Sequence, residues 1–152
     1  MKLDQAQRQI LTLLQKDSTL STQALAEQVG LSPSPCWRRV RELEAAGLIR
    51  GYVALLDRNK LGLSTCVWVR VKLKKHSAEV LDRFETVVKG CDEVVECYEL
   101  LGETDCLLKL YLPSLEALST FMHNFLLKLP EVDVTHSSVA LREIKNETAL
   151  PL

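Results

Sequence analysis

Hydrophobic residues recur at helical spacing in two short stretches near the start of the chain. The first stretch, residues 4–16, opens with Asp4 as a capping residue and then repeats apolar side chains every three or four positions. In the second stretch, Ser21 precedes an apolar stripe around Leu25, and Gly30 supplies the residue type that commonly ends a helix. The pattern predicts two helices, the second followed by a turn of about three residues.

A third stretch, residues 32–47, carries an apolar side and a cationic side. Cys36, Val40 and Leu43 share one side of a helix in which successive residues are about 100° apart. Trp37 lies at the border of that side, so we expect it to pack in the core, with stacking on a DNA base as the alternative. Long cationic side chains on the opposite side can reach guanine edges and phosphate oxygens. The candidate DNA contacts are Ser32, Ser34, Arg38, Arg39 and Arg41.

Two short helices joined by a tight turn, with arginines projecting from the second, form the helix-turn-helix arrangement that enters a DNA major groove. Pro33 and Pro35 place the start of the arginine-bearing helix, in the third stretch, between residues 32 and 34. The alternative is a solvated helix surface on which the arginines pair with Glu42 and Glu44. The preceding helix, the turn and the basic charge of this part of the chain favour DNA binding.

Two domains are expected on either side of residue 60. Residues 48–57 form a β-prone run, which predicts a strand that serves as a wing or connecting arm, and the polar residues 57–60 then indicate a linker. Residues 1–60 carry nine basic and six acidic side chains, whereas residues 61–152 carry ten and fourteen. A small domain that attracts anions is therefore attached to an acidic one.

The second half of the chain alternates between the periods of strands and helices. Val67, Val69 and Val71 alternate with polar or bulky residues, as in a strand with one buried face. The predicted elements are a strand at 67–73, a helix at 80–91, strands at 94–101 and 106–112, a helix at 115–129 and a strand at 132–141. This order predicts a ferredoxin-like βαββαβ domain with two helices on one face of an antiparallel sheet. The fold class of the whole chain is then α+β.

The other face of this sheet needs a cover, because no predicted helix is left to pack on it. Trp68, together with Tyr98 or Tyr111, can lie on that face. An apolar sheet face that its own helices leave open in a small domain predicts self-association of the chain.

Length and composition set the class of protein. The chain has 152 residues, of which 47% are hydrophobic and 26% are charged, as in an average globular protein. This length suits one ordinary domain or two small ones and argues against a large single-core enzyme. No apolar run approaches the length of a membrane span, and the N-terminus turns polar at once. We therefore expect a soluble, cytoplasmic protein with no membrane partner.

Residue types that bind metals or carry catalysis are scattered along the chain. The cysteines, which include no Cys-x-x-Cys pair, are Cys36, Cys66, Cys91, Cys97 and Cys106. Their odd number predicts reduced thiols that pack as small hydrophobic groups. His76, His123 and His136 show no metal-ligand spacing, and no phosphate loop or nucleophile motif occurs. We expect no metal site, no catalytic residues and no enzyme activity.

Three segments of the chain are specific when taken together. They are Leu-Ser-Pro-Ser-Pro-Cys-Trp-Arg-Arg-Val-Arg-Glu-Leu-Glu at 31–44, Gly-Glu-Thr-Asp at 102–105, and Ser-Ser-Val-Ala-Leu-Arg-Glu-Ile-Lys at 137–145. With them, nearly the whole chain resembles the Lrp/AsnC family of transcription regulators, also called feast/famine regulatory proteins. The resemblance implies a winged helix-turn-helix DNA-binding domain at 1–60 and, at 61–152, a ligand-responsive domain that dimerises through its sheet and assembles further, often into octamers.

The resemblance also implies an amino-acid effector, bound between dimers near the hairpin turn at 102–105. An α-amino acid needs an acceptor for its ammonium group, for which Asp105 is a candidate, and donors for its carboxylate. The candidate effector residues are Gly102, Glu103, Thr104, Asp105, Ser137 and Ser138. Gly102 and Asp105 can instead simply shape a tight turn. The leucines that flank the turn favour leucine or methionine as effector, with cysteine as an alternative.

We therefore expect an amino-acid-responsive regulator that binds double-stranded promoter DNA as a homodimer within a higher oligomer, with no cofactor besides its effector. A second hypothesis is a small ferredoxin-like ligand-binding protein or metabolic enzyme whose N-terminal helices mediate protein contacts. The arginines outside the apolar stripe favour the first. An RNA-binding module is a third hypothesis, but no aromatic-rich strand of the kind that stacks RNA bases is present.

Overall fold

The computed structural model describes residues 3–75 and 77–152, and the chain divides into two compact units. The helix unit comprises the chain up to Leu55 together with Ile144–Leu152, and the sheet unit comprises Leu56–Glu143. The last nine residues, which the sequence pattern placed with the sheet, thus group with the helices. The Gln15 side chain holds them there, because it accepts a hydrogen bond from the Leu150 N–H at 2.6 Å and donates one to the Leu150 carbonyl at 3.3 Å.

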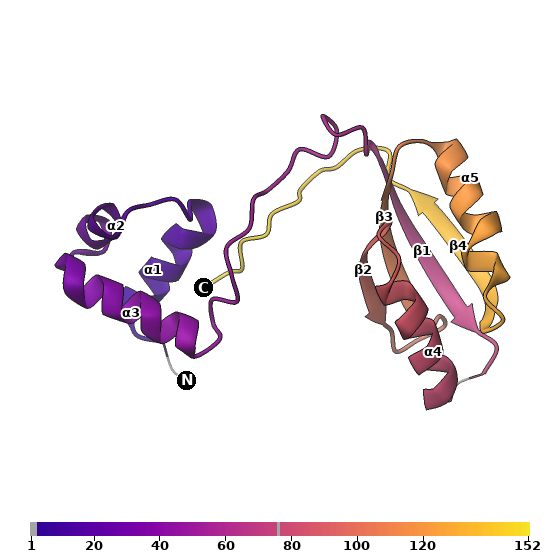
Figure 1. Ribbon diagram of the computed structural model, residues 1–152, viewed down its shortest axis with the longest axis horizontal. Helices are drawn as coiled ribbons and strands as arrows, with labels where there is room; N and C mark the ends of the chain where they lie inside the picture. Colours follow the sequence, from indigo (N-terminus) through magenta and orange to yellow (C-terminus); the bar gives the residue numbers. More distant parts are fainter. Residues whose placement is uncertain (1–2, 76) are drawn as a thin grey trace. The chain divides into compact units, whose positions relative to one another are not determined.

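The helix unit contains α1 (Gln5–Lys16), α2 (Thr22–Val29) and α3 (Pro33–Ala45), which are drawn in indigo to purple in Figure 1. The predicted caps are present. The Asp4 carboxylate accepts from the Gln7 N–H at 2.7 Å, and the Gln7 side chain accepts from the Asp4 N–H at 3.0 Å. Ser21 caps α2, and Gly30 takes the left-handed conformation, with φ of 70°, that ends it. The three predicted helices are confirmed.

The apolar core of the helix unit is small and comes from all three helices. Its buried members are Ile10, Leu11, Leu25, Ala26, Cys36 and Leu43. Partly buried residues between Leu3 and Ile49 surround them. These positions follow the helical stripes of the sequence, so burial of one face of each helix brings the three together.

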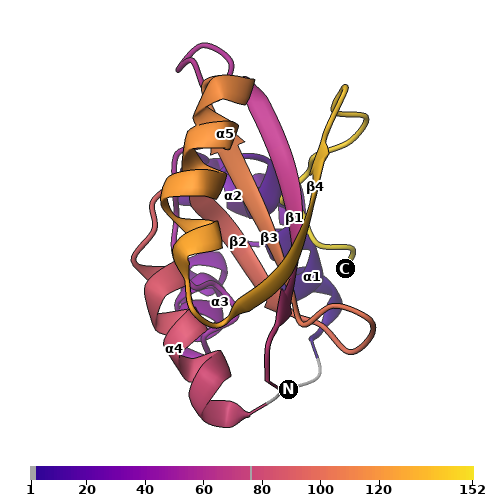
Figure 2. The same cartoon turned by 90° about the vertical axis from the view of Figure 1, so that its right-hand side faces the viewer.

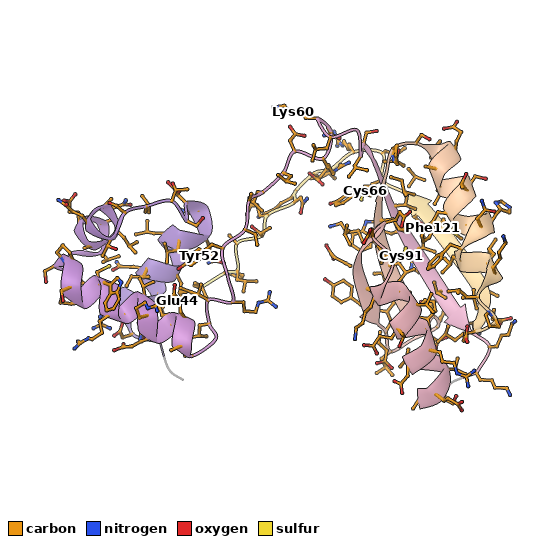
Figure 3. The ribbon with its side chains drawn as sticks, in the orientation of Figure 1. Glu44, Tyr52, Lys60, Cys66, Cys91 and Phe121 are labelled. Carbon is orange, nitrogen blue, oxygen red and sulfur yellow. The ribbon has the colours of Figure 1, made fainter. Side chains whose placement is uncertain are left out.

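The expected strand at 48–57 is wrong. In the structure this segment follows the end of α3, where Gly47 has φ of 71°, and it belongs to no strand. A strand is stable only when a second strand pairs with it, and the described residues offer this segment no such partner. The segment is instead attached to α3 by a side chain: the Tyr52 hydroxyl donates to the Glu44 carboxylate at 3.0 Å, and both residues are marked in Figure 3.

The sheet unit is a four-stranded antiparallel sheet with the strand order β2-β3-β1-β4. Its elements are β1 (Thr65–Leu73), α4 (Ala78–Lys89), β2 (Val94–Glu99), β3 (Cys106–Leu112), α5 (Leu115–Asn124), a short 3-10 helix (Leu126–Lys128) and β4 (Val132–Val139). Figure 2 shows α4 and α5 on the same face of the sheet. The predicted ferredoxin-like topology and the α+β class are confirmed.

The two faces of the sheet differ in their cover. Residues of β1 and β3 that face the helices, such as Val69 and Leu108, are fully buried together with Phe84 of α4. The register places Trp68 opposite Lys109 on the other face, as the alternation of side chains requires.

No helix among the described residues is long and apolar enough to cross a membrane.

Candidate DNA-binding and effector sites

The second and third helices form the helix-turn-helix element. Only Gly30, Leu31 and Ser32 separate α2 from α3, and the Leu31 N–H bonds back to the Ala26 carbonyl at 2.9 Å. Ser32 precedes the first residue of α3, but its side chain makes no capping hydrogen bond, and both Ser32 and Ser34 are exposed. Cys36 and Leu43 are buried, so the opposite face of α3 is directed to solvent.

Arg38 and Arg41 extend from the exposed face of α3, as predicted. Their side chains are 72% and 63% exposed, respectively. Arg38 lies 3.7 Å from the Glu42 carboxylate, and Arg41 donates to the Glu44 carboxylate at 2.8 Å. Exposed ion pairs of this kind contribute little free energy, so DNA phosphates can replace the carboxylates as partners.

Arg39 lies elsewhere. Its guanidinium pairs with the Asp4 carboxylate, and its side chain is only 29% exposed. The Gln7 N–H holds the pKa of Asp4 below its usual range, and Arg39 lowers it further. Arg39 therefore fixes the start of α1 against α3, and the structure does not place it beside Arg38 and Arg41.

Trp37 is 56% exposed, so the expectation that it packs in the core is wrong. Cys36 and Val40 occupy the inward positions on this part of α3, and one step around the helix from Cys36 turns Trp37 to solvent. The Arg41 guanidinium lies 5.9 Å from the centre of the Trp37 ring. An exposed aromatic ring beside a cation adds Trp37 to the surface that Arg38 and Arg41 form.

The hairpin connection between β2 and β3 is held tightly. The Leu100 N–H bonds to the Asp105 carbonyl at 2.8 Å, and the Asp105 N–H bonds to the Val71 carbonyl at 2.9 Å. The Asp105 carboxylate also accepts from the Leu73 N–H at 2.7 Å. Asp105 therefore ties the turn to β1, which supports its role in shaping the turn.

A wide depression lies beside this turn on the sheet face that no helix covers. Its volume is about 820 Å³, and its lining residues are Arg70, Lys72, Glu103, Thr104, Val134 and His136. The pairing of β1 with β4 creates it, because Arg70 lies opposite His136 and Lys72 opposite Val134. The depression offers three cationic or ionisable nitrogen groups and one carboxylate. Glu103 and Thr104 were predicted from the sequence as effector contacts, whereas the other four lining residues were not.

The adjacent residues Ser137 and Ser138 lie on opposite faces of the sheet. Ser138 is paired with Trp68 on the open face, whereas Ser137 is paired with Val69 on the face that the helices cover. The Ser137 hydroxyl accordingly contacts the Met122 sulfur at 3.8 Å. Neither serine lines the depression beside the turn.

In the part of the chain that the structure describes, no group of three or more His, Cys, Asp or Glu side chains is arranged so that it could hold a metal ion. The cysteines are free thiols. His76 lies outside the described residues.

Comparison with known proteins agrees with both halves of this geometry. Residues 3–50 match the family described as winged helix-turn-helix DNA-binding, and residues 66–150 match the Lrp/AsnC ligand binding domain. The chain is 40% identical to the DNA-binding transcriptional activator DecR of Escherichia coli K12 over 150 residues, which are 99% of each protein. It is also 40% identical to the leucine-responsive regulatory protein of the same organism over 148 residues, 97% of this chain and 90% of the relative.

A solved structure extends the comparison to the fold. A transcriptional regulator of Neisseria meningitidis, determined as a complex with L-methionine, superposes with a TM-score of 0.95 at 38% identity, covering 99% of this chain and 97% of the other. These relatives are transcription regulators, which excludes the metabolic-enzyme hypothesis. The chain therefore belongs to the Lrp/AsnC family of transcriptional regulators and joins a winged helix-turn-helix DNA-binding domain to a ligand-binding domain.

Proposed function

We propose that this regulator acts in the cytoplasm and binds double-stranded promoter DNA by inserting α3 into the major groove, with Arg38 and Arg41 as its main contacts. The observation that carries this proposal is the exposure of both guanidinium groups on the helix that follows a three-residue turn. Ser34 and Trp37 lie on the same helix, Ser32 directly precedes it, and all three are exposed, so they can contact the DNA backbone. A gel shift with the upstream region of the protein's own gene, at two salt concentrations, tests this proposal.

The uncovered sheet face supports assembly of the chain. Trp68 and Tyr111 flank Lys109 there, with the Lys109 ammonium 5.3 Å and 5.4 Å from their ring centres. Glu96 neutralises this ammonium at 2.8 Å. Aromatic rings around an internally paired charge form a surface that a second copy can cover at little electrostatic cost. We expect a homodimer through the part of this face around Trp68, Lys109 and Tyr111, and association of dimers into an octamer.

Replacing Trp68 with alanine is expected to weaken the dimer at least about tenfold, because aromatic anchors at the centre of an interface each contribute roughly 2 kcal/mol or more. Analytical ultracentrifugation over a range of protein concentrations measures the change. Trp37→Ala is the control, since it removes the same ring from the helix unit and should leave the dimer intact. Equal dimerisation of Trp68→Ala and the wild type would contradict the assignment of this face.

The depression beside the turn suits an α-amino acid. Arg70 and Lys72 can bind the carboxylate, Glu103 can accept from the ammonium group, and Val134 supplies apolar surface for the side chain. The depression is open, so a second dimer placed against it would enclose the ligand. Methionine and leucine are the first candidates, because one relative was solved with L-methionine and another is named for its response to leucine. Cysteine remains the alternative.

Arg70→Met is expected to lower the affinity for the effector roughly tenfold or more, since a hydrogen bond to a charged group is worth about 1.5–3 kcal/mol. Isothermal titration with the twenty amino acids identifies the effector and measures the loss. Arg83→Met on α4 is the control, because Arg83 lies outside the depression and pairs with Glu79 of its own helix. Asp105→Ala should reduce binding and also lower the melting temperature, through loss of the bond to Leu73. Heat from no amino acid, or equal binding by Arg70→Met and the wild type, would contradict the proposed site.

A further inference from the structure

Two cysteines meet at the base of the hairpin that carries the turn at 100–105. Cys97 on β2 lies opposite Leu108, and Cys106 on β3 lies opposite Glu99, so the two cysteines are diagonal neighbours on the same face of the sheet. Both side chains line the same cavity, and each cysteine shifts the pKa of the other. The pair therefore joins the two strands next to the turn, with Cys97 before the chain reverses and Cys106 directly after it.

The two thiols differ in access. Cys106 is only 2% exposed, whereas Cys97 is exposed on the edge strand β2. Both line a cavity of about 450 Å³ between α4 and β2, to which Phe84 and Val88 contribute apolar walls and Lys89 an ammonium group. A small solute can therefore reach Cys97 from solvent, and the buried Cys106 lines the same cavity as its diagonal neighbour.

The two thiols also differ in the direction in which their pKa values are shifted. The Cys106 side chain lowers the pKa of Cys97, against the opposing effects of burial and of Glu85. Cys97 in turn raises the pKa of Cys106. Burial raises the pKa of Cys36 and Cys66, and burial together with Glu93 raises that of Cys91 to about 11. Because the thiolate is the reactive form, Cys97 is the cysteine best suited to react.

We propose that Cys97 is a peroxide-sensitive site and that Cys106 resolves its oxidised form as a disulfide. The Cys97 thiolate attacks one oxygen of hydrogen peroxide, the O–O bond breaks, and the departing hydroxide takes up a proton to give water and a sulfenic acid. The Cys106 sulfur then attacks the Cys97 sulfur, and the sulfenic hydroxyl leaves with the Cys106 proton as a second water. The two thiols lose two electrons in total, and the peroxide gains them.

The position of the pair predicts a bond that is easily reversed. Diagonal neighbours on antiparallel strands have Cα atoms about 7–8 Å apart, slightly beyond the span of a relaxed disulfide. Bond formation must therefore draw β2 towards β3, and β2 can move because it is an edge strand with an irregular register between Val94 and Glu96. A strained disulfide is readily reduced, which suits a regulatory bond. Formation of the disulfide would also restrain the turn. An effect of this restraint on effector binding rests on the proposed function, whereas the thiol chemistry itself does not.

The test is to treat the reduced full-length protein with hydrogen peroxide, alkylate the remaining thiols and analyse the peptides by mass spectrometry. We expect one intramolecular link, Cys97 to Cys106, with a loss of two hydrogen atoms that dithiothreitol restores. The link should be absent from Cys97→Ser and from Cys106→Ala, and Cys106→Ala should instead accumulate a sulfenic acid that dimedone traps at Cys97. Cys91→Ser is the control. It changes a different cysteine of the sheet unit, which is partly buried and marked in Figure 3, and it should form the link like the wild type.

Circular dichroism shows whether each variant is folded, and Cys97→Ser keeps the test valid if Cys106→Ala does not fold, because Cys97 is exposed. Amide hydrogen exchange of residues 100–105 should slow in the oxidised wild type and remain unchanged in peroxide-treated Cys97→Ser. A link between other cysteines, or peroxide uptake by Cys97→Ser at the wild-type rate, would overturn the proposal. Neither outcome would affect the proposed binding of DNA or of an amino acid.

Discussion

Arg38→Ala and Arg41→Ala are each expected to weaken specific DNA binding by about 1–3 kcal/mol, the usual range for a lost contact to a base edge. Both side chains project from α3 away from the buried Cys36 and Leu43, so their removal should leave the melting temperature and the oligomer size unchanged. Arg39→Ala should behave differently and destabilise the helix unit, because Arg39 binds the cap of α1.

Fluorescence anisotropy with operator and random DNA, at two salt concentrations, distinguishes the two kinds of contact. A lost base contact relaxes specificity at one position, whereas a lost phosphate contact weakens all sequences alike and lowers the salt slope by about one. Arg8→Ala is the control, since Arg8 is an exposed arginine on α1 of the same unit. Wild-type affinity in both Arg38→Ala and Arg41→Ala would remove α3 as the recognition helix.

Phe84→Ala is expected to destabilise the sheet unit by about 3–5 kcal/mol, the range for removing a fully buried aromatic ring. Phe84 is almost completely buried in the core of the sheet unit, and that core shares no described residue with the core of the helix unit. The transition of the helix unit should therefore stay where it is in the wild type. If copies of the chain assemble through the proposed surface of the sheet unit, DNA binding should weaken as well, because that surface is part of the destabilised unit.

The two tryptophans allow the units to be followed separately, because Trp37 lies in the helix unit and Trp68 in the sheet unit. In Trp37→Phe the tryptophan fluorescence during urea unfolding follows the sheet unit, because Trp68 is the tryptophan that remains. In Trp68→Phe it follows the helix unit. Val87→Ala is the matched control on α4, since Val87 is partly exposed and its truncation should cost far less. An equal shift of both transitions in Phe84→Ala would show that the units unfold together.

Features that depend on neighbours in sequence were predictable from the sequence. The caps of α1 and α2, the left-handed Gly30 and the alternation of Val67, Val69 and Val71 all follow from local chemistry. The same alternation places Ser137 and Ser138 on opposite faces of β4, so the prediction that both contact one effector conflicted with the predicted strand. The strand expected at 48–57 failed because β-propensity cannot show whether a partner strand exists.

The parts of the site that the sequence missed depend on pairing between distant strands. Arg70 and Lys72 could be assigned to one face of β1 from their spacing, but only the register with β4 brings His136 and Val134 beside them. The bond from the Leu73 N–H to Asp105 likewise crosses from one strand to a distant turn. Trp37 lay at the border of a helical stripe, where a small rotation of the helix decides between core and solvent.

The bond between Gln15 and Leu150 has a consequence for the order in which this protein forms on the ribosome. All residues of the helix unit's apolar cluster lie between Leu3 and Ile49, so that core is complete early in translation and the three helices can pack as they emerge. The clamp on Leu150 can close only after the whole sheet unit has been synthesised. A nascent chain can thus present a folded helix-turn-helix unit before the sheet unit is complete, and the C-terminal segment docks onto helices that have already formed.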